Sequence, residues 1–189
     1  MRTFAFGCAV LLVACGGSAP VRTQYLLRAA RPPQAARVAG PARIGLGRVA
    51  VAPYLDQPGI VVETGAREVR PAQNHRWAEP LSDGLRLYLW TALSNALGED
   101  VGLDPADRDR WDYVVDVFVE RFHGTASGEA VLVAVFRIEP GAAAEPGTEH
   151  PFTGSLALAR EGYDALVDAE VALAGQLADA IAAALPRRR

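Results

Sequence analysis

The sequence predicts a single α/β domain in which two main helices pack on a sheet. The chain has 189 residues, 50% of them hydrophobic, and a chain of this size buries one good core. Two long segments, 81–97 and 163–185, carry apolar side chains at steps of three and four, as a helix with one buried face does. Strand-like segments stand before the first of these helices and between the two. One shared core is therefore expected.

The first residues have the pattern of a lipoprotein signal peptide. Arg2 supplies a short positive region, residues 4–13 an apolar core, and Leu12-Val13-Ala14-Cys15 the pattern of a lipobox. The apolar run is too short to span a bilayer, which needs about twenty residues. We therefore expect residues 1–14 to be removed. The alternative is an ordinary secretory signal in which Cys15 is incidental.

The resemblance to a lipobox implies that Cys15 becomes the acylated first residue of the mature chain. It would carry diacylglycerol and an amide-linked acyl chain, and two or more chains anchor a protein stably to a membrane. Gly16, in place of Asp, resembles the sorting pattern for the outer membrane. The other cysteine, Cys8, lies inside the apolar run. We therefore expect no disulfide, no thiol catalysis and no cysteine metal site.

Residues 15–22 are small and polar enough to form a flexible tether, and the compact domain is expected over residues 23–186. Residues 24–27 are long enough for an edge strand. The Pro, Ala and Gly residues between 29 and 42 indicate a loose connection. The chain ends in a short tail of three arginines, 187–189.

Residues 44–52 predict a strand that is apolar on both faces and stops at Pro53. This segment contains the letters of a dinucleotide-binding fingerprint, but that motif needs a helix after the strand. β-branched residues and Pro53 follow instead, so cofactor binding is not expected. Residues 60–63 and 68–70 then predict a β-hairpin with Gly65 in the turn.

The helix over residues 81–97 begins after Pro80, which fits a first turn, and ends at Gly98. Its apolar stripe comprises Leu81, Leu85, Leu89, Ala92, Leu93 and Ala96. Apolar residues off the stripe, including Trp90, indicate that the helix is largely enclosed. Trp77, just before it, is predicted to fill the space between helix and sheet.

The second half of the chain predicts a hairpin, a further strand and the closing helix. Residues 104–109 form a charged turn, and the strand after it alternates inward valines with outward acids. Phe118 and Phe122 are expected on the outer side of that strand. A turn over 124–128 leads to residues 130–138, which are apolar on both faces and therefore expected to be central. After a loop over 140–149 and a strand over 152–159, the last helix has the stripe Leu166, Leu173, Leu177, Ile181 and Leu185.

Catalytic and metal-binding patterns are absent from the sequence. His75, His123 and His150 each stand alone, without a second ligand at zinc spacing, so each is expected to be structural or exposed. The Gly124–Gly128 turn does not match the G-x-S-x-G elbow, because its serine stands one place too late. Net charge is −3, and the only basic block is the Arg tail, which argues against nucleic-acid binding.

The run Gly45-Leu46-Gly47-Arg48-Val49-Ala50-Val51-Ala52-Pro53-Tyr54-Leu55-Asp56-Gln57-Pro58-Gly59-Ile60-Val61, followed by Thr64-Gly65 and Arg76-Trp77-Ala78-Glu79-Pro80-Leu81, resembles the ABC-type transport auxiliary lipoproteins, also called PqiC-like. The resemblance implies a mixed, mainly antiparallel sheet packed with helices. It implies an outer-membrane lipoprotein that faces the periplasm and partners an MCE-domain protein of an inner-membrane complex. It brings no catalytic residue and no cofactor. The motif residues Tyr54, Gly65, Trp77, Glu79 and Pro80 are expected to be structural.

Three functions are compatible with the sequence. In the first, the protein is an anchored, homo-oligomeric docking component that helps to move lipid, phospholipid included, without chemistry of its own. In the second it is an envelope hydrolase, which the missing nucleophile and metal spacing argue against. In the third it is a structural lipoprotein of the envelope. Among these the resemblance favours the docking component.

Overall fold

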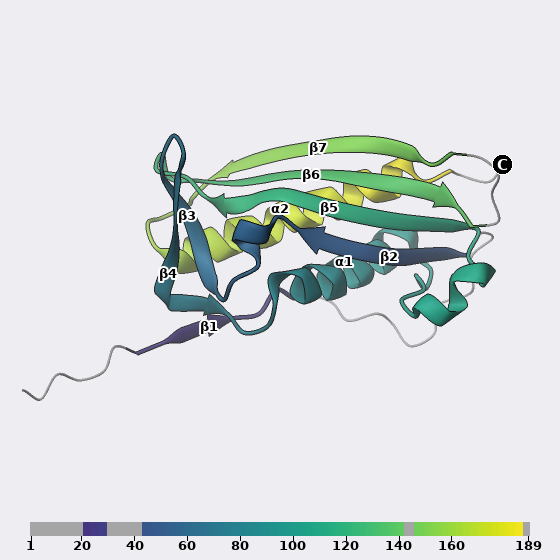
Figure 1. Ribbon diagram of the computed structural model, residues 1–189, viewed down its shortest axis with the longest axis horizontal. Helices are drawn as coiled ribbons and strands as arrows, with labels where there is room; N and C mark the ends of the chain where they lie inside the picture. Colours follow the sequence, from purple (N-terminus) through teal and green to yellow (C-terminus); the bar gives the residue numbers. More distant parts are fainter. Residues whose placement is uncertain (1–20, 30–42, 142–145, 187–189) are drawn as a thin grey trace, which may run out of the picture.

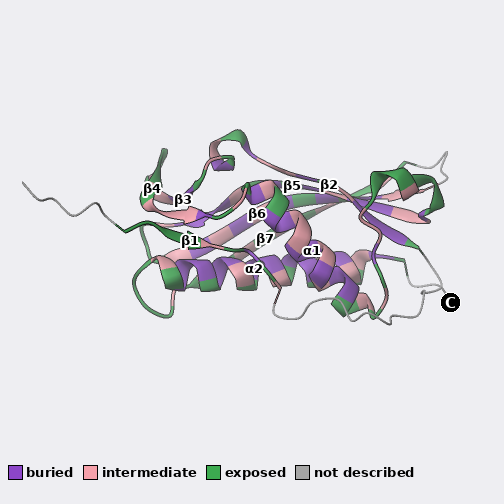
Figure 2. Ribbon diagram, turned by 90° about the horizontal axis from the view of Figure 1, so that it is seen from below, coloured by how far each residue is buried: buried purple, intermediate pink, exposed green. Residues whose placement is uncertain are grey.

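A mixed sheet of seven strands organises the structure, and two helices cover one of its faces (Figure 1, Figure 2). The computed structural model describes residues 21–29, 43–141 and 146–186. Within them the strand order is β1-β4-β3-β5-β6-β7, and β2 pairs with β5 beside this path. The predicted α/β class with two main helices is therefore confirmed.

Most of the sheet is antiparallel. The strands are β1 (Thr23–Tyr25), β2 (Ile44–Val51), β3 (Gly59–Gly65), β4 (Glu68–Trp77), β5 (Tyr113–Gly124), β6 (Glu129–Pro140) and β7 (Thr148–Ala157). The helices are α1 (Leu81–Leu97) and α2 (Tyr163–Ala184), and the short 3-10 helices are η1 (Pro53–Leu55) and η2 (Pro105–Arg110). β3–β4, β5–β6 and β6–β7 are antiparallel. β1 pairs in parallel with β4, β2 in parallel with β5, and β3 meets β5 in a short parallel pairing at Val62. Residues 30–42 of the predicted connection and residues 142–145 of the predicted loop lie outside the described residues.

The core lies between the helices and the inner face of the sheet. The predicted stripe of α2, from Leu166 to Leu185, is buried along its whole length. From the sheet it meets the inward side chains of β6, which are Ala130, Leu132, Ala134, Phe136 and Ile138. The outward acids predicted for α2, Asp164, Asp168 and Asp179, are exposed. Helical phase alone therefore located this interface correctly.

The structure confirms the leucines of the stripe predicted for α1, but its last residue, Ala96, was wrongly expected to be buried. Leu81, Leu85, Leu89 and Leu93 are buried, but Ala96 is exposed. After the helix, the chain folds back over the side of α1 that carries Ser94 and not over the side that carries Ala96. There, Val101 N donates to Ser94 Oγ at 3.2 Å. Trp90 Nε1 donates to Val101 O at 2.7 Å on the same side. The last turn therefore buries Ser94 and leaves Ala96 in solvent. The predicted stop at Gly98 is present, with φ of 71°.

Phe122 is buried, and the prediction that it lies on the outer side of its strand is wrong. The pairing of β5 with β6 shifts by one residue between Val119 and Arg121. Such a bulge turns every later side chain to the opposite face. Phe122 therefore pairs with Leu132 in the core and is 2% exposed, whereas Phe118, before the bulge, stays outside.

β6 is apolar on both faces but buried on only one. It lies between β5 and β7, as a non-edge strand, yet Val135 on its outer face is 38% exposed. No described helix covers that face (Figure 2). The apolar residues on both faces of β6 therefore predicted correctly that it lies between two other strands, but wrongly that both faces are buried.

The β3–β4 hairpin differs slightly from the prediction. Gly65 is the last residue of β3 and pairs with Glu68, so the turn consists of residues 66 and 67. β4 continues well beyond the predicted residues 68–70, through Pro71 to Trp77. Pro71 is tolerated because β1 pairs with β4 only from His75 onward, so the edge beside the proline needs no N–H donor.

Candidate functional site

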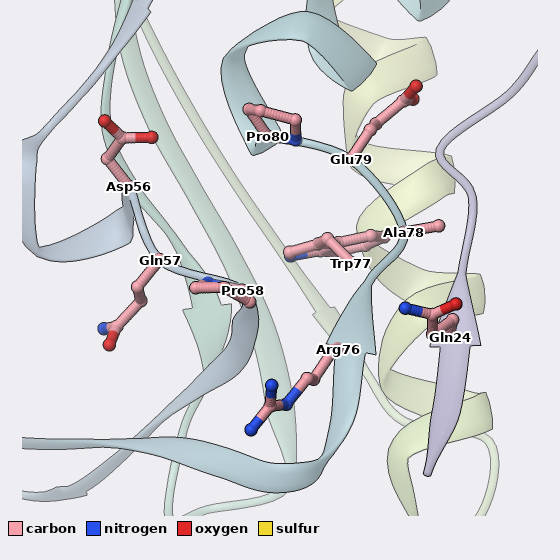
Figure 3. Close-up of a pocket in the computed structure, with 9 residues that line it drawn as sticks. All are labelled: Gln24, Asp56, Gln57, Pro58, Arg76, Trp77, Ala78, Glu79 and Pro80. Atoms are coloured by element: carbon pink, nitrogen blue, oxygen red, sulfur yellow. The ribbon is translucent and has the colours of Figure 1, made fainter.

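A pocket opens where β4 ends and the chain turns into α1 (Figure 3). Its cavity volume is about 490 Å³, and it is lined by Gln24, Asp56, Gln57, Pro58, Arg76, Trp77, Ala78, Glu79 and Pro80. These residues come from β1, from the segment between η1 and β3, and from the end of β4 with the residues after it. The pocket therefore joins two segments of the motif, residues 56–58 and 76–80. We call it the motif pocket.

Backbone hydrogen bonds hold the three segments of the motif pocket together. Trp77 N donates to Pro58 O at 2.8 Å, and Ala78 N donates to Tyr25 O at 2.8 Å. Gly59 allows the close approach of β3 and β4, because a Cβ at this position would lie 2.5 Å from Ala72 O. The walls of the pocket are therefore set by main-chain geometry.

Trp77 forms the floor of the motif pocket and is 6% exposed. Its ring centroid lies 6.2 Å from that of Phe122 on β5. It thus lies between helix and sheet where the sequence placed it, and its structural role stays a prediction. Pro80 precedes the first residue of α1 instead of lying in its first turn.

The carboxylate of Glu79 forms an ion pair with Arg28. Both carboxylate oxygens accept from Arg28, Oε1 in a short bond from Nη1 and Oε2 from Nη2 at 2.9 Å. These hydrogen bonds lower the pKa of Glu79. A carboxylate held in this way is ionised and is poorly suited to act as a general acid.

Two other motif residues lie outside the pocket. Tyr54 OH donates to Glu120 O at 3.1 Å, and its ring meets His123 edge-on at 6.2 Å. It therefore fastens η1 to β5. Gly65 lies at the opposite end of the β3–β4 hairpin from Trp77.

The three histidines lie apart from one another. His123 is buried with Nδ1 2.9 Å from Gly124 O, and His150 stacks on Phe136 at 5.0 Å. His75 stacks on Tyr163 at 4.2 Å, and its Nδ1 lies 2.9 Å from Tyr25 OH. The described residues contain no group of three potential metal ligands.

A cluster on Tyr25 fastens the short strand β1 to α2. Tyr25 OH donates to Asp164 Oδ1 at 2.7 Å. Burial, followed by the hydrogen bond to Asp164, raises the pKa of Tyr25 to about 12. The hydroxyl therefore keeps its proton at neutral pH. It holds the wall that supplies Gln24 to the motif pocket.

The predicted lipidation site, Cys15, lies outside the described residues, as do the predicted signal peptide and the Arg tail. Within the described residues, no helix is both long enough and apolar enough to cross a bilayer.

Glu170 was missed by reasoning from the sequence. It lies on the buried face of α2, in phase with Leu166, Leu173 and Leu177, and is 1% exposed. Its Oε2 has no hydrogen-bond partner among the described residues. Burial raises the pKa of Glu170 well above its usual value, because the apolar surroundings favour the protonated, neutral carboxyl. The spacing to the leucine stripe was the signal that could have found it.

Comparison with known proteins identifies a family model that matches residues 25–182, the ABC-type transport auxiliary lipoprotein component. A crystal structure of an uncharacterized protein is similar at a TM-score of 0.73 and 26% identity, over 87% of this chain and 98% of that one. A structure from Xanthomonas campestris, of the DUF330 family, has a TM-score of 0.70 and 18% identity, over 85% and 92% of the two chains. The PelC dodecamer from Paraburkholderia phytofirmans is more distant, with a TM-score of 0.40, 15% identity and coverage of 76% and 92%. No curated protein matches significantly.

Proposed function

The chain belongs to the ABC-type transport auxiliary lipoprotein component family, and from that premise we propose that it is a docking component of an MCE-type system for intermembrane lipid transport. In this proposal Cys15 anchors it to the outer membrane, and the domain faces the periplasm as a homo-oligomer. The partner is the MCE-domain protein of an inner-membrane complex, and the cargo is lipid, with phospholipid as the expected class. The protein itself catalyses no reaction.

The observation that carries the docking proposal is the motif pocket. Residues 56–58 and 76–80, which are far apart in the chain, meet there with β1, and backbone hydrogen bonds fix their arrangement. A concave surface that combines apolar side chains with a few placed polar groups is typical of a binding site. Docking is therefore a better explanation of this geometry than support of the core alone.

The chemistry of the pocket favours binding over catalysis. Its lining includes no serine, cysteine, threonine or histidine, so it offers none of the common nucleophiles or imidazole bases. Glu79 is held ionised by Arg28, and Asp56 is exposed. A hydrolase would need at least one activated group there.

The length of the tether constrains how docking occurs. Residues 16–22 separate the proposed anchor from β1. A flexible linker of that length spans about 15 Å. The domain therefore stays close to the membrane that holds Cys15, and the inner-membrane partner must bridge most of the gap.

The proposal is tested by crosslinking in cells. The acylated protein is crosslinked, purified and analysed for covalently attached proteins, with Cys15→Ser as the unanchored control. We expect an MCE-domain protein on the acylated form and much less on the control, because the anchor concentrates the protein at its membrane. Deletion should also increase outer-membrane permeability.

Two outcomes would replace this proposal. Recovery of no MCE-domain protein, with permeability unchanged on deletion, would favour a structural lipoprotein of the envelope. Hydrolysis of ester or glycoside substrates by the purified protein would favour an envelope enzyme.

A further inference from the structure

Building on the proposed docking function, we propose that the motif pocket binds an extended peptide segment of the partner through an acidic side chain that pairs with Arg76. The apolar surface of Trp77 and the adjoining prolines Pro58 and Pro80 receives an apolar side chain from the same face of that segment. The inference thus names the chemistry of the partner at the site where docking is proposed.

Arg76 differs from the other half-buried arginines in that its terminal guanidinium nitrogens have no acceptor among the described residues. Arg76, Arg86 and Arg121 are half-buried, whereas the other described arginines are exposed. The terminal nitrogens of two of them have acceptors: Arg86 Nη2 donates to Leu103 O at 2.6 Å, and Arg121 Nη2 to Glu63 Oε2 at 2.8 Å. Within the described part of the chain, Arg76 donates only from Nε, to Gln73 O at 3.0 Å. Among described residues, no carboxylate lies within ion-pair distance of it.

The acids near Arg76 are engaged or solvated. Glu79 pairs with Arg28, and Figure 3 shows its carboxylate directed away from Arg76. Asp56 is exposed, and no ion pair joins it to Arg76. A guanidinium presents a planar fork of donors that fits a carboxylate bidentately. A carboxylate entering the pocket would therefore supply the partner that the described residues do not.

The surroundings of Arg76 suit a peptide. Figure 3 shows Trp77 across the middle of the pocket, between Pro58 and Gln24, with Arg76 beside it. Peptide-binding surfaces combine an apolar contact with polar groups around it. An extended segment lying on this floor can place an apolar side chain on Trp77 and an acidic one on Arg76.

A phospholipid suits the same pocket less well. Five of the nine lining residues are polar or charged, namely Gln24, Asp56, Gln57, Arg76 and Glu79. Binding sites for lipid tails are lined predominantly by hydrophobic side chains. The pocket could meet a lipid phosphate, but its apolar side chains are limited to Pro58, Trp77, Ala78 and Pro80, a short surface that suits one side chain better than long acyl chains. The observations therefore favour a peptide.

The test selects binders from a displayed library of random twelve-residue peptides on the full acylated protein in detergent. We expect enriched peptides to share an Asp or Glu two positions from an apolar residue, because alternate side chains of an extended peptide face the same way. The most enriched peptide is then synthesised, and its affinity is measured by the change in tryptophan fluorescence. Arg76→Gln should weaken binding roughly tenfold or more, because it removes the charged half of the pair. Arg76→Lys should recover part of the loss.

Matched controls separate a binding role from a structural one. Arg67→Gln removes an exposed arginine in the β3–β4 turn and should leave the affinity unchanged. A peptide with Asn or Gln in place of its acid should bind as weakly to the wild type as the original does to Arg76→Gln. A C-terminally amidated peptide should keep its affinity, since the proposed carboxylate belongs to a side chain. Unchanged thermal unfolding of Arg76→Gln shows that the pocket remains folded.

Several results would overturn the inference. One is enrichment without an acidic consensus, and another is equal selection by the wild type and Arg76→Gln. A third is Arg76-dependent binding of vesicles of phosphatidylethanolamine and phosphatidylglycerol without binding of the peptides, which would assign the pocket to a lipid headgroup. If the peptides fail while crosslinking still recovers an MCE-domain protein, docking stands and only this account of the pocket is wrong.

Discussion

Replacing Glu170 with Gln should stabilise the fold at neutral pH, and the gain should increase as the pH rises. Glu170 is buried on the face of α2 that carries the leucine stripe, and its Oε2 has no partner among the described residues. The inward residues of β6 that meet α2 are apolar. From α1, Tyr88 reaches α2 near Gly175, and burial raises the pKa of Tyr88 too, so it brings no charge at neutral pH.

The size of the stability gain follows from the carboxyl proton that Glu170 keeps in the folded state. Burial raises the pKa of Glu170 well above its usual value, whereas in the unfolded chain the group ionises above about pH 4.3. Stability contributed by this group is thus fully present below about pH 4.3 and is lost as the pH rises toward the folded pKa. The slope is about 1.4 kcal/mol per pH unit in that window. Gln cannot ionise, so Glu170→Gln removes the slope.

The assay is urea unfolding of the non-acylated form at several pH values between about 5 and 7. The free energy of unfolding of Glu170→Gln relative to wild type should grow by up to about 1.4 kcal/mol per pH unit. Glu170→Leu, which also removes the unsatisfied oxygen, should add about 1–3 kcal/mol. Asp168→Asn, an exposed acid on the same helix, is the control and should show little pH-dependent change. Parallel pH profiles for wild type and Glu170→Gln would refute the reasoning, because they would mean that Glu170 is ionised or exposed in the fold.

Three further predictions concern the anchor, the pocket floor and the hairpin. Cys15→Ser should leave a folded protein that neither incorporates palmitate nor floats with outer membranes, and palmitate labelling of that variant would contradict the anchor. Trp77→Ala should cost about 3–5 kcal/mol, because it empties a buried aromatic site, so unchanged thermal unfolding would assign Trp77 to surface function instead. Gly59→Ala should cost about 1–3 kcal/mol, because its Cβ would meet Ala72 O, and an unchanged urea midpoint would show that β3 and β4 can separate freely.

The helices could be predicted because each carries a long, regular pattern. The stripe of α2 spans its whole length, and the bounds of α1 agree with the residues between Pro80 and Gly98. Local propensity and long-range packing favour the same structure in these segments, so each turn of the helix repeats the signal.

The departures have causes that local patterns do not contain. The bulge that buries Phe122 is defined by pairing with another strand, and periodicity within one strand cannot reveal it. Whether the outer face at Val135 is covered depends on elements elsewhere in the chain. The sequence predicts only a structural role for the motif residues of the pocket, since their meeting depends on the pairing of β1, β3 and β4, which no local pattern contains. Arg76 was therefore not distinguished from other arginines.

The most direct test of docking places a photo-crosslinking amino acid at single positions of the acylated protein in cells. Gln57 lines the motif pocket, whereas Gln176 is exposed on α2 and serves as the matched control. Both replacements exchange a glutamine that lies outside the core. The account predicts an ultraviolet-dependent crosslink from position 57 to an MCE-domain protein and none from position 176. A crosslink to that protein from position 176 alone, or from neither position, would contradict it.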